Sequence, residues 1–267
     1  MRKKRLICLT ILALVTAWVL WANTALEVNV WTVENEKIPA AFDGFRIAQV
    51  SDLHNTAHWK DAVKALEKAQ PDIIVLTGDL IDSRNTDVDA ALDFARAAVN
   101  IAPCFYVSGN HESRVSEWPL LRQGLKEAGV TVLEDEKVPL EREGSSITLL
   151  GLRDPDFGGD QAAALEKLAA QEDGFTILLS HRPERLELYA QYGMDLVFSG
   201  HAHGGQVRIP FAGGLAAPHQ GLFPKYDAGL YELNGTSMLV SRGVGNSIIP
   251  LRINNRPEIV VAVLEGI

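Results

Sequence analysis

The chain has 267 residues, 47% hydrophobic and 22% charged, which is enough for a sizeable core and unlike a disordered, collagen-like or disulfide-rich protein. Its formal net charge is −9, and it is −13 without the four basic residues at positions 2–5. An acidic chain of this kind lacks the basic footprint of a nucleic-acid-binding protein, so we expect no nucleic-acid partner. Both cysteines, Cys8 and Cys104, lie in apolar stretches, and no disulfide is expected.

The N-terminal segment has the pattern of a membrane anchor. Residues 2–5 are Arg-Lys-Lys-Arg, and residues 6–22 carry no charge. A helix of that length spans roughly 25 Å, close to a hydrocarbon core of about 30 Å. Trp18 and Trp21 suit the far membrane interface, and the basic cluster is expected to stay cytoplasmic.

We therefore predict that residues 1–26 are an uncleaved single-pass anchor and that residues 27–267 form one domain outside the cytoplasmic membrane. A cleavable signal peptide, followed by secretion, stays open as the alternative, with Ala22-Asn23-Thr24-Ala25 as the hint of a cleavage site.

Beyond the anchor, apolar strands alternate with amphipathic helices, which predicts an α/β layered domain. The predicted strands span residues 45–50, 73–76, 104–107, 147–150, 176–179 and 196–198. The predicted helices span residues 60–69, 88–100, 118–128, 161–171 and 183–192. Short strands separated by Gly and Pro follow residue 205, and Asn234-Gly235 predicts a tight hairpin turn between residues 230–233 and 237–240.

Side chains that can bind metals follow five of the predicted strands. The five segments are Asp52-Leu53-His54, Gly78-Asp79 with Asp82, Gly109-Asn110-His111-Glu112, His181, and Gly200-His201-Ala202-His203. Ligands bind at the carboxyl ends of strands in α/β sheets, because side chains converge there. Carboxylate, imidazole and amide oxygen suit Zn, Mn or Fe. Each motif alone is common, but the five together predict one metal centre.

The five motifs resemble those of the calcineurin-like metallophosphoesterases, D-x-H, G-D-x-x-D, G-N-H-[DE], H and G-H-x-H, over roughly residues 44–264. The resemblance implies a four-layer α/β/β/α sandwich of two mixed β-sheets flanked by helices. It also implies a centre of two divalent metal ions (Mn, Zn or Fe), in which a bridging hydroxide attacks phosphorus in line. In this chain Asp52, His54 and His203 would hold one metal, Asn110, His181 and His201 the other, and Asp79 would bridge them.

Further residues are candidates for catalysis or substrate binding. By the same resemblance, His111 would protonate the leaving oxygen or stabilise charge in the transition state. Asp82 would orient His111 or a ligand, with a helix N-cap as the alternative. Arg242 and Arg252 are candidates for a phosphate clamp or ordinary surface arginines. His219 is a candidate for the substrate cleft, and otherwise a surface residue.

The predicted function is a dinuclear-metal-dependent phosphoesterase that hydrolyses a phosphodiester, phosphomonoester or pyrophosphate at the outer side of the cytoplasmic membrane. Residues 200–206, 241–245 and 250–252 look like those of a bacterial branch with membrane-anchored or exported members. The substrate stays open between a phosphorylated small molecule, a lipid or lipid-linked pyrophosphate such as the UDP-diacylglucosamine type, and an envelope polymer. A non-catalytic metal-binding scaffold is the weaker alternative, because such relatives tend to lose ligands that this chain keeps. The sequence does not predict the oligomeric state.

Overall fold

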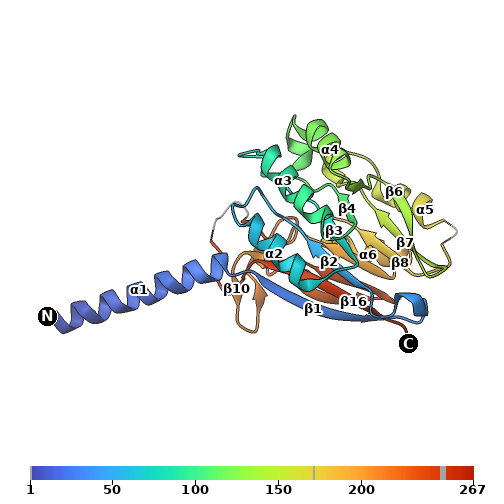
Figure 1. Cartoon of the computed structure of the whole chain (residues 1–267). Coiled ribbons are helices and arrows are strands. Elements are labelled where there is room, and N and C mark those ends of the chain that lie inside the picture. The colour runs from blue at the N-terminus through green and yellow to red at the C-terminus, as the bar shows by residue number, and fades with distance from the viewer. Residues whose placement is uncertain (1, 171, 247–250) are drawn as a thin grey trace.

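The structure is a computed structural model that describes residues 2–170, 172–246 and 251–267. Two six-stranded sheets pack face to face, and helices cover their outer faces (Figure 1). The N-terminal helix α1 (Arg2–Thr24) projects from this body as a separate rod.

The first sheet has the strand order β1-β16-β2-β3-β4-β5. Its strands are β1 (Glu27–Glu34), β2 (Arg46–Val50), β3 (Ile73–Thr77), β4 (Cys104–Val107), β5 (Thr131–Val132) and β16 (Glu258–Glu265). Strands β2 to β5 run parallel, as expected where helices return the chain between strands. β16 is antiparallel to β2 and parallel to β1, so the sheet is mixed.

The second sheet has the order β14-β15-β9-β8-β7-β6. Its strands are β6 (Glu136–Arg142), β7 (Ser145–Gly151), β8 (Thr176–Leu179), β9 (Leu196–Ser199), β14 (Gly229–Leu233) and β15 (Thr236–Val240). The four central strands are parallel, and each edge strand is attached by an antiparallel hairpin. Asn234 and Gly235, with φ of 51° and 84°, join β14 to β15, which confirms the predicted tight turn.

Three hydrophobic layers hold the sandwich together. Helices α2 (Trp59–Ala69), α3 (Val88–Val99) and α4 (Trp118–Glu127) pack on the first sheet, and α5 (Gln161–Ala169) and α6 (Leu186–Gln191) pack on the second. In β3, Ile73 and Val75 face the second sheet, whereas Ile74 and Leu76 face the helices. Strands buried on both faces are apolar throughout, which is why they stand out in the sequence. The predicted α/β/β/α sandwich is confirmed.

The predicted strands match β2, β3, β4, β7, β8 and β9 to within a few residues. The predicted helices match α2, α3 and α4, and the fourth ends at Ala169 as α5; its expected last residue, Gln171, lies outside the described residues. The expected helix 183–192 is a 3-10 turn (Pro183–Arg185) followed by α6.

The sequence did not predict β1, β5, β6, β16 or the short elements of the loops. The short strands are β10 (Arg208–Ile209), β11 (Gly213–Gly214), β12 (Ala216–Ala217) and β13 (Gly221–Leu222). The 3-10 turns are η1 (Ala40–Phe42), η2 (Glu112–Arg114), η3 (Pro155–Phe157), η4 (Pro183–Arg185) and η5 (His203–Gly205).

Helix α1 is long and apolar enough to cross a membrane, since it has 23 residues and an 18-residue stretch within it has a mean hydropathy of 2.1. Nearly all of it is exposed, so it is not a core helix of the sandwich. The predicted apolar N-terminal helix is therefore present, and it supports association with a membrane.

Candidate metal centre

The five motifs meet at one end of the paired sheets. β2, β3 and β4 deliver the first three motifs from one sheet, and β8 and β9 deliver the last two from the other. Gln49 of β2 joins the sheets there, because its amide donates to Thr77 Oγ1 and to the backbone oxygen of Ser199, both at 2.8 Å. All seven predicted ligands are buried: Asp52, His54, Asp79, Asn110, His181, His201 and His203.

One group of ligand atoms comes from Asp52, His54 and His203. The Nε2 atoms of His54 and His203 lie 3.1 Å apart, and His203 Nε2 lies 3.3 Å from Asp52 Oδ1. Asp79 Oδ2 lies 3.7 Å from His54 Nε2 on the inner side of this group.

The second group is arranged around His181. Its Nε2 lies 3.2 Å from Asp79 Oδ2, 3.2 Å from Asn110 Oδ1 and 3.1 Å from His201 Nδ1. The same oxygen of Asp79 therefore borders both groups, which is the position that a bridging carboxylate requires.

These distances fit metal coordination better than hydrogen bonding. Metal–ligand bonds of about 2.1 Å place neighbouring ligand atoms about 3.0–3.4 Å apart. The second group has these spacings, and so do two pairs of the first group, in which His54 Nε2 lies further from Asp52 Oδ1, at 3.8 Å, and from Asp79 Oδ2, at 3.7 Å. A proton between two imidazole nitrogens satisfies only one pair of atoms, whereas three or more converge in each group. The donor set therefore fits two divalent metal ions of the nitrogen- and oxygen-binding kind.

Burial sets the protonation of most of these ligands. Burial lowers the pKa of His54 to about 4 and holds the pKa of His201 and of His203 well below the ordinary value, which favours the neutral imidazole that binds metals. Burial alone would raise the pKa of Asp79, but His181 and His54 hold it well below its usual range. Burial likewise opposes the charge of His181, yet Asp79 and other carboxylates raise its pKa to about 10, a sign of negative potential that suits a cation.

The backbone of the centre is strained. Asp52, His54, Asp79, His201 and His203 all have φ between 46° and 65°, a region that residues other than glycine adopt infrequently. Strain of this kind concentrates at functional sites, where the surrounding structure over-determines it. The glycines of the motifs permit the close packing: a Cβ at Gly109 would lie 2.3 Å from Asp79 Oδ1, and one at Gly200 would lie 1.9 Å from Ser51 Oγ.

Glu112 holds two of the ligand loops together, a role that the sequence reading did not assign. Its buried carboxylate accepts hydrogen bonds from the backbone N–H groups of Asp79, Leu80 and Gly109 at 2.8–3.0 Å. Burial and the nearby Asp79 raise its pKa to about 8. The signal in the sequence that could have identified this role is the position of Glu112 as the last residue of the G-N-H-E motif.

His111 lies beside the metal ligands with a defined tautomer. The backbone N–H of Ser83 donates to His111 Nδ1 at 2.9 Å, so the ring proton of the neutral imidazole resides on Nε2. That Nε2 lies 4.0 Å from Asp79 Oδ2, facing the centre. Burial lowers the pKa of His111, which favours this neutral form.

Asp82 lies behind His111, with Oδ1 3.6 Å from Nδ1, and it pairs with Arg84 at 2.7 Å. The 3.6 Å between Asp82 Oδ1 and His111 Nδ1 is longer than a hydrogen bond. The alternative expectation of a helix N-cap is wrong, because Asp87 caps α3 by accepting from the backbone N–H of Ala90.

The expectation that Arg242 and Arg252 clamp a phosphate, or are ordinary surface arginines, is wrong. Arg242 is largely buried and pairs with Glu258 at 2.8 Å and with Glu27. Arg252 is fully buried and donates to the backbone oxygens of Gly243 and Gly245. Both guanidinium groups hold the chain between β15 and β16. Residue 250, which belongs to the segment 250–252 considered above, lies outside the described residues.

His219 lies next to the centre. Its Nδ1 lies 2.9 Å from His201 Nε2 and 2.8 Å from Arg182 Nη1, and its side chain is exposed at the rim. Arg182, which was not predicted from the sequence, is buried and forms a bidentate salt bridge with Asp154 at 2.6 and 2.8 Å. Glu184, His201 and His219 also lie close together, but the Arg182 guanidinium already supplies a cation among them, so we do not assign them a further metal ion.

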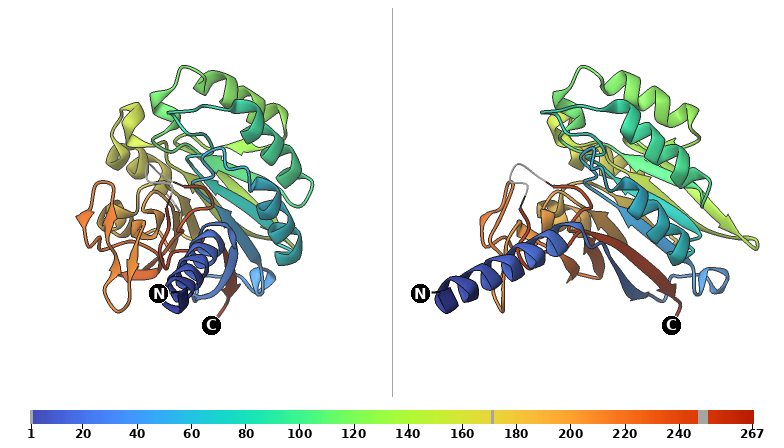
Figure 2. Two further views of the ribbon diagram at one scale, coloured as in Figure 1. Left: turned by 90° about the vertical axis from the view of Figure 1, so that its left-hand side faces the viewer. Right: turned by 60° about the vertical axis from the view of Figure 1, so that its left-hand side comes forward.

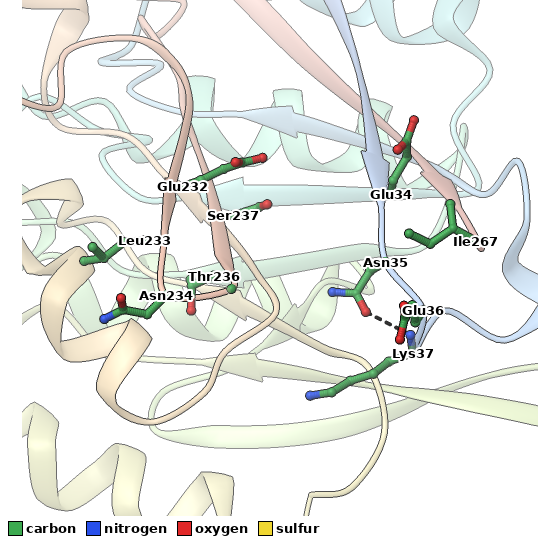
Figure 3. Close-up of a pocket in the computed structure, with 11 residues that line it drawn as sticks. Glu34, Asn35, Glu36, Lys37, Glu232, Leu233, Asn234, Thr236, Ser237 and Ile267 are labelled. Carbon is green, nitrogen blue, oxygen red and sulfur yellow. Dashed lines mark hydrogen bonds between the residues drawn. The ribbon is translucent and has the colours of Figure 1, made fainter.

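A separate hollow lies between the β14–β15 turn and residues 34–37 (Figure 3). Thr236, the first residue of β15, lines it, whereas the metal loops follow the last residue of the parallel strand β9. The hollow is therefore at the opposite end of the second sheet. The described residues that line it include no histidine, and we assign it no part in the chemistry of the metal centre.

Comparison with known sequences places this geometry in a family context. The family model described as calcineurin-like phosphoesterase matches residues 45–205, which include all five motifs. An uncharacterized metallophosphoesterase of Bacillus subtilis, YkuE, is 31% identical over 90% of this chain and 86% of its own length. The phosphodiesterase YaeI of Escherichia coli is 30% identical over 80% of each chain.

Two further comparisons concern the anchor and the fold. A protein of Bos taurus named transmembrane protein with metallophosphoesterase domain is 30% identical over 91% of this chain, which spans 59% of that longer protein. Among solved structures, TT1561 of Thermus thermophilus superposes with a TM-score of 0.53 at 14% identity, covering 74% of this chain and 89% of that one. At that identity the likeness shows the fold alone.

Proposed function

The chain belongs to the calcineurin-like phosphoesterase family of metal-dependent phosphoric ester hydrolases, and we propose that the centre at the strand ends is its dinuclear active site. The observation that carries the proposal is the position of Asp79 Oδ2, which lies within 3.7 Å of His54 Nε2 and 3.2 Å of His181 Nε2. Asp52, His54 and His203 would hold one metal, Asn110, His181 and His201 the other, and Asp79 both. The metal identity stays between Mn, Zn and Fe, since this donor set accepts all three.

Two divalent ions held there would polarise the phosphoryl oxygens and activate water for in-line displacement. The chain's own residues position the reacting groups. Glu112 fixes the loop of Asp79 against that of Asn110, and Arg182 holds His219 beside His201. Because Ser83 occupies His111 Nδ1, His111 would present its Nε2–H to a phosphoryl or leaving oxygen, so that it stabilises charge as a hydrogen-bond donor.

The substrate is proposed to be a phosphodiester, with phosphomonoesters and pyrophosphates, including lipid-linked ones, as the alternatives. The E. coli relative that is named a phosphodiesterase supports this order. The non-catalytic scaffold has less support, because every ligand position and His111 lie together in one buried centre.

We further propose that residues 1–26 anchor the chain and that residues 27–267 act at the outer side of the cytoplasmic membrane. The support is the exposed α1, the basic residues at its N-terminal end, and relatives with transmembrane names.

The test is hydrolysis of bis-nitrophenyl phosphate by the full chain in detergent with Mn²⁺. Asp79→Asn should abolish turnover and lower the bound metal, since it removes the carboxylate shared by both groups. Asp89→Asn, the same chemical change at an exposed position of α3, is the matched control. Turnover in Asp79→Asn equal to that of the control would overturn the proposed active site.

A further inference from the structure

Two small hairpins expose large apolar side chains at the end of the domain from which α1 leaves. The hairpins β10–β11 and β12–β13 lie within residues 208–222. Phe211 is fully exposed, and Leu222 and Phe223 are 71% and 58% exposed. Figures 1 and 2 place this orange segment at the end of the body where the C-terminal end of α1 joins it. Exposed aromatic and leucine side chains so grouped are typical of an interaction surface. We call residues 208–223 the apolar hairpin segment.

Hydrogen bonds attach the apolar hairpin segment to the base of α1. Asn23, near the end of α1, donates to the backbone oxygen of Arg252 and accepts from its N–H, at 3.1 and 2.7 Å. The next residue, Ile253, forms an isolated β-bridge with Val207, and its backbone oxygen accepts from the N–H of Arg208 at 2.9 Å. The helix and the hairpins are therefore fixed relative to each other through the strip 252–253.

The same segment borders the metal centre. The N–H of Leu215 donates to the backbone oxygen of Gly205 in the loop that carries His203. His219, in the turn between β12 and β13, lies 2.9 Å from His201, and Leu222 and Phe223 follow a few residues later. The mouth of the metal centre and the apolar side chains are thus parts of one structure.

The end of α1 shows where a bilayer surface would lie. Trp18 and Trp21 are about half exposed near its C-terminal end, and the Arg256 guanidinium lies 4.5 Å from the Trp21 ring. Tryptophan beside a cationic group is typical of the membrane–water interface. Since the apolar hairpin segment lies at this end of the domain, its side chains and Trp21 would meet the same layer of lipid.

We propose that the apolar hairpin segment is a second membrane contact, in which Phe211, Leu222 and Phe223 insert into the interfacial layer of the bilayer beside α1. The occupant is lipid because these exposed side chains belong to the end of the domain where α1, a helix long and apolar enough to span a membrane, joins it. The contact would hold the mouth of the metal centre against the bilayer, so that phosphoesters presented at the membrane surface reach it directly. That consequence rests on the proposed function, whereas the contact itself does not.

The experiment places a fluorophore on the surface of the full chain. Leu222→Cys, in a Cys8→Ser background, is labelled with an environment-sensitive dye and reconstituted into vesicles of phosphatidylethanolamine and phosphatidylglycerol that contain a nitroxide-labelled lipid. Leu120→Cys is the matched control, since it is a leucine that is 61% exposed on α4, away from α1 (Figure 1). The dye at position 222 should be quenched several-fold more strongly than the dye at position 120. If Leu222→Cys does not fold, Phe211→Cys takes its place.

Equal quenching at the two positions would overturn the proposal. Energy transfer between differently labelled chains at position 222, without quenching by lipid, would also overturn it and would assign the surface to a second copy of the chain. Hydrolysis of soluble bis-nitrophenyl phosphate is measured on the same vesicles. Lipid quenching without any hydrolysis would refute the proposed function and leave the membrane contact standing.

Discussion

At the scale of single residues, His111 is the group whose role the structure sharpens most. His111→Ala should lower kcat by about 100- to 10,000-fold, because it removes the donor that faces the centre. Bound metal should stay at the wild-type level, since His111 is not among the proposed ligands. Steady-state kinetics with elemental analysis of the same sample checks both parts.

The matched control for that variant is His58→Ala, which removes an exposed histidine outside the motifs. A loss of metal in His111→Ala that parallels the loss of kcat would contradict the assigned role and make His111 a ligand.

The proposed metal ligands could be predicted from the sequence because each follows an apolar strand that is buried on both faces. Arg182 and Asp154 act through a contact that no local pattern contains, whereas Glu112 belongs to the G-N-H-E motif. Asp154 lies 28 residues before Arg182, and only the pairing of the second sheet brings the two together. The prediction of a phosphate clamp was wrong for a related reason. Arg252 follows two glycines in a segment that looks exposed in the sequence, yet its guanidinium is buried and donates to the backbone oxygens of Gly243 and Gly245.

At the scale of elements, continuous apolar runs in the sequence predicted the central strands. Amphipathic patterns predicted the helices that cover the two sheets. Most of the strands that were missed lack such runs, and β16, whose residues 259–264 are all apolar, is the exception. β1 alternates exposed and partly buried residues, and β5 and β10 to β13 are two residues long, so tertiary contacts define them.

The β14–β15 hairpin gives a stability prediction at this scale. Gly235→Ala should lower the free energy of unfolding by about 1–2 kcal/mol, because alanine is strained at a φ of 84°. Metal content and turnover should stay unchanged, since the turn lies at the end of the sheet opposite to the centre. Urea denaturation followed by circular dichroism measures the change.

Asn234→Gly serves as the control for this turn, because glycine accepts the φ of 51° found there. A turnover loss in Gly235→Ala without a shift of the urea midpoint would contradict the assignment of this hairpin as purely structural.

At the scale of the whole molecule, the junction between anchor and domain is short and tightly held. α1 ends at Thr24 and β1 begins at Glu27, so two residues separate them. Arg256 donates to the backbone oxygen of Ala25 at 2.8 Å and pairs with Glu27. A domain held in this way would have little freedom to tilt away from a membrane in which α1 is anchored, so the proposed anchor and the metal centre are structurally linked.

The side of the membrane on which the domain lies can be measured with one introduced cysteine. In spheroplasts of a bacterial host, Leu120→Cys should react with a membrane-impermeant maleimide before lysis as fully as after it, because the basic residues at the N-terminal end of α1 favour a cytoplasmic N-terminus. The wild-type chain is a silent control: Cys8 lies in the apolar helix, and burial raises the pKa of the Cys104 thiol to about 12. Labelling only after lysis would contradict the outward orientation, and a labelled chain lacking the mass of α1 would identify cleavage and secretion in place of anchoring.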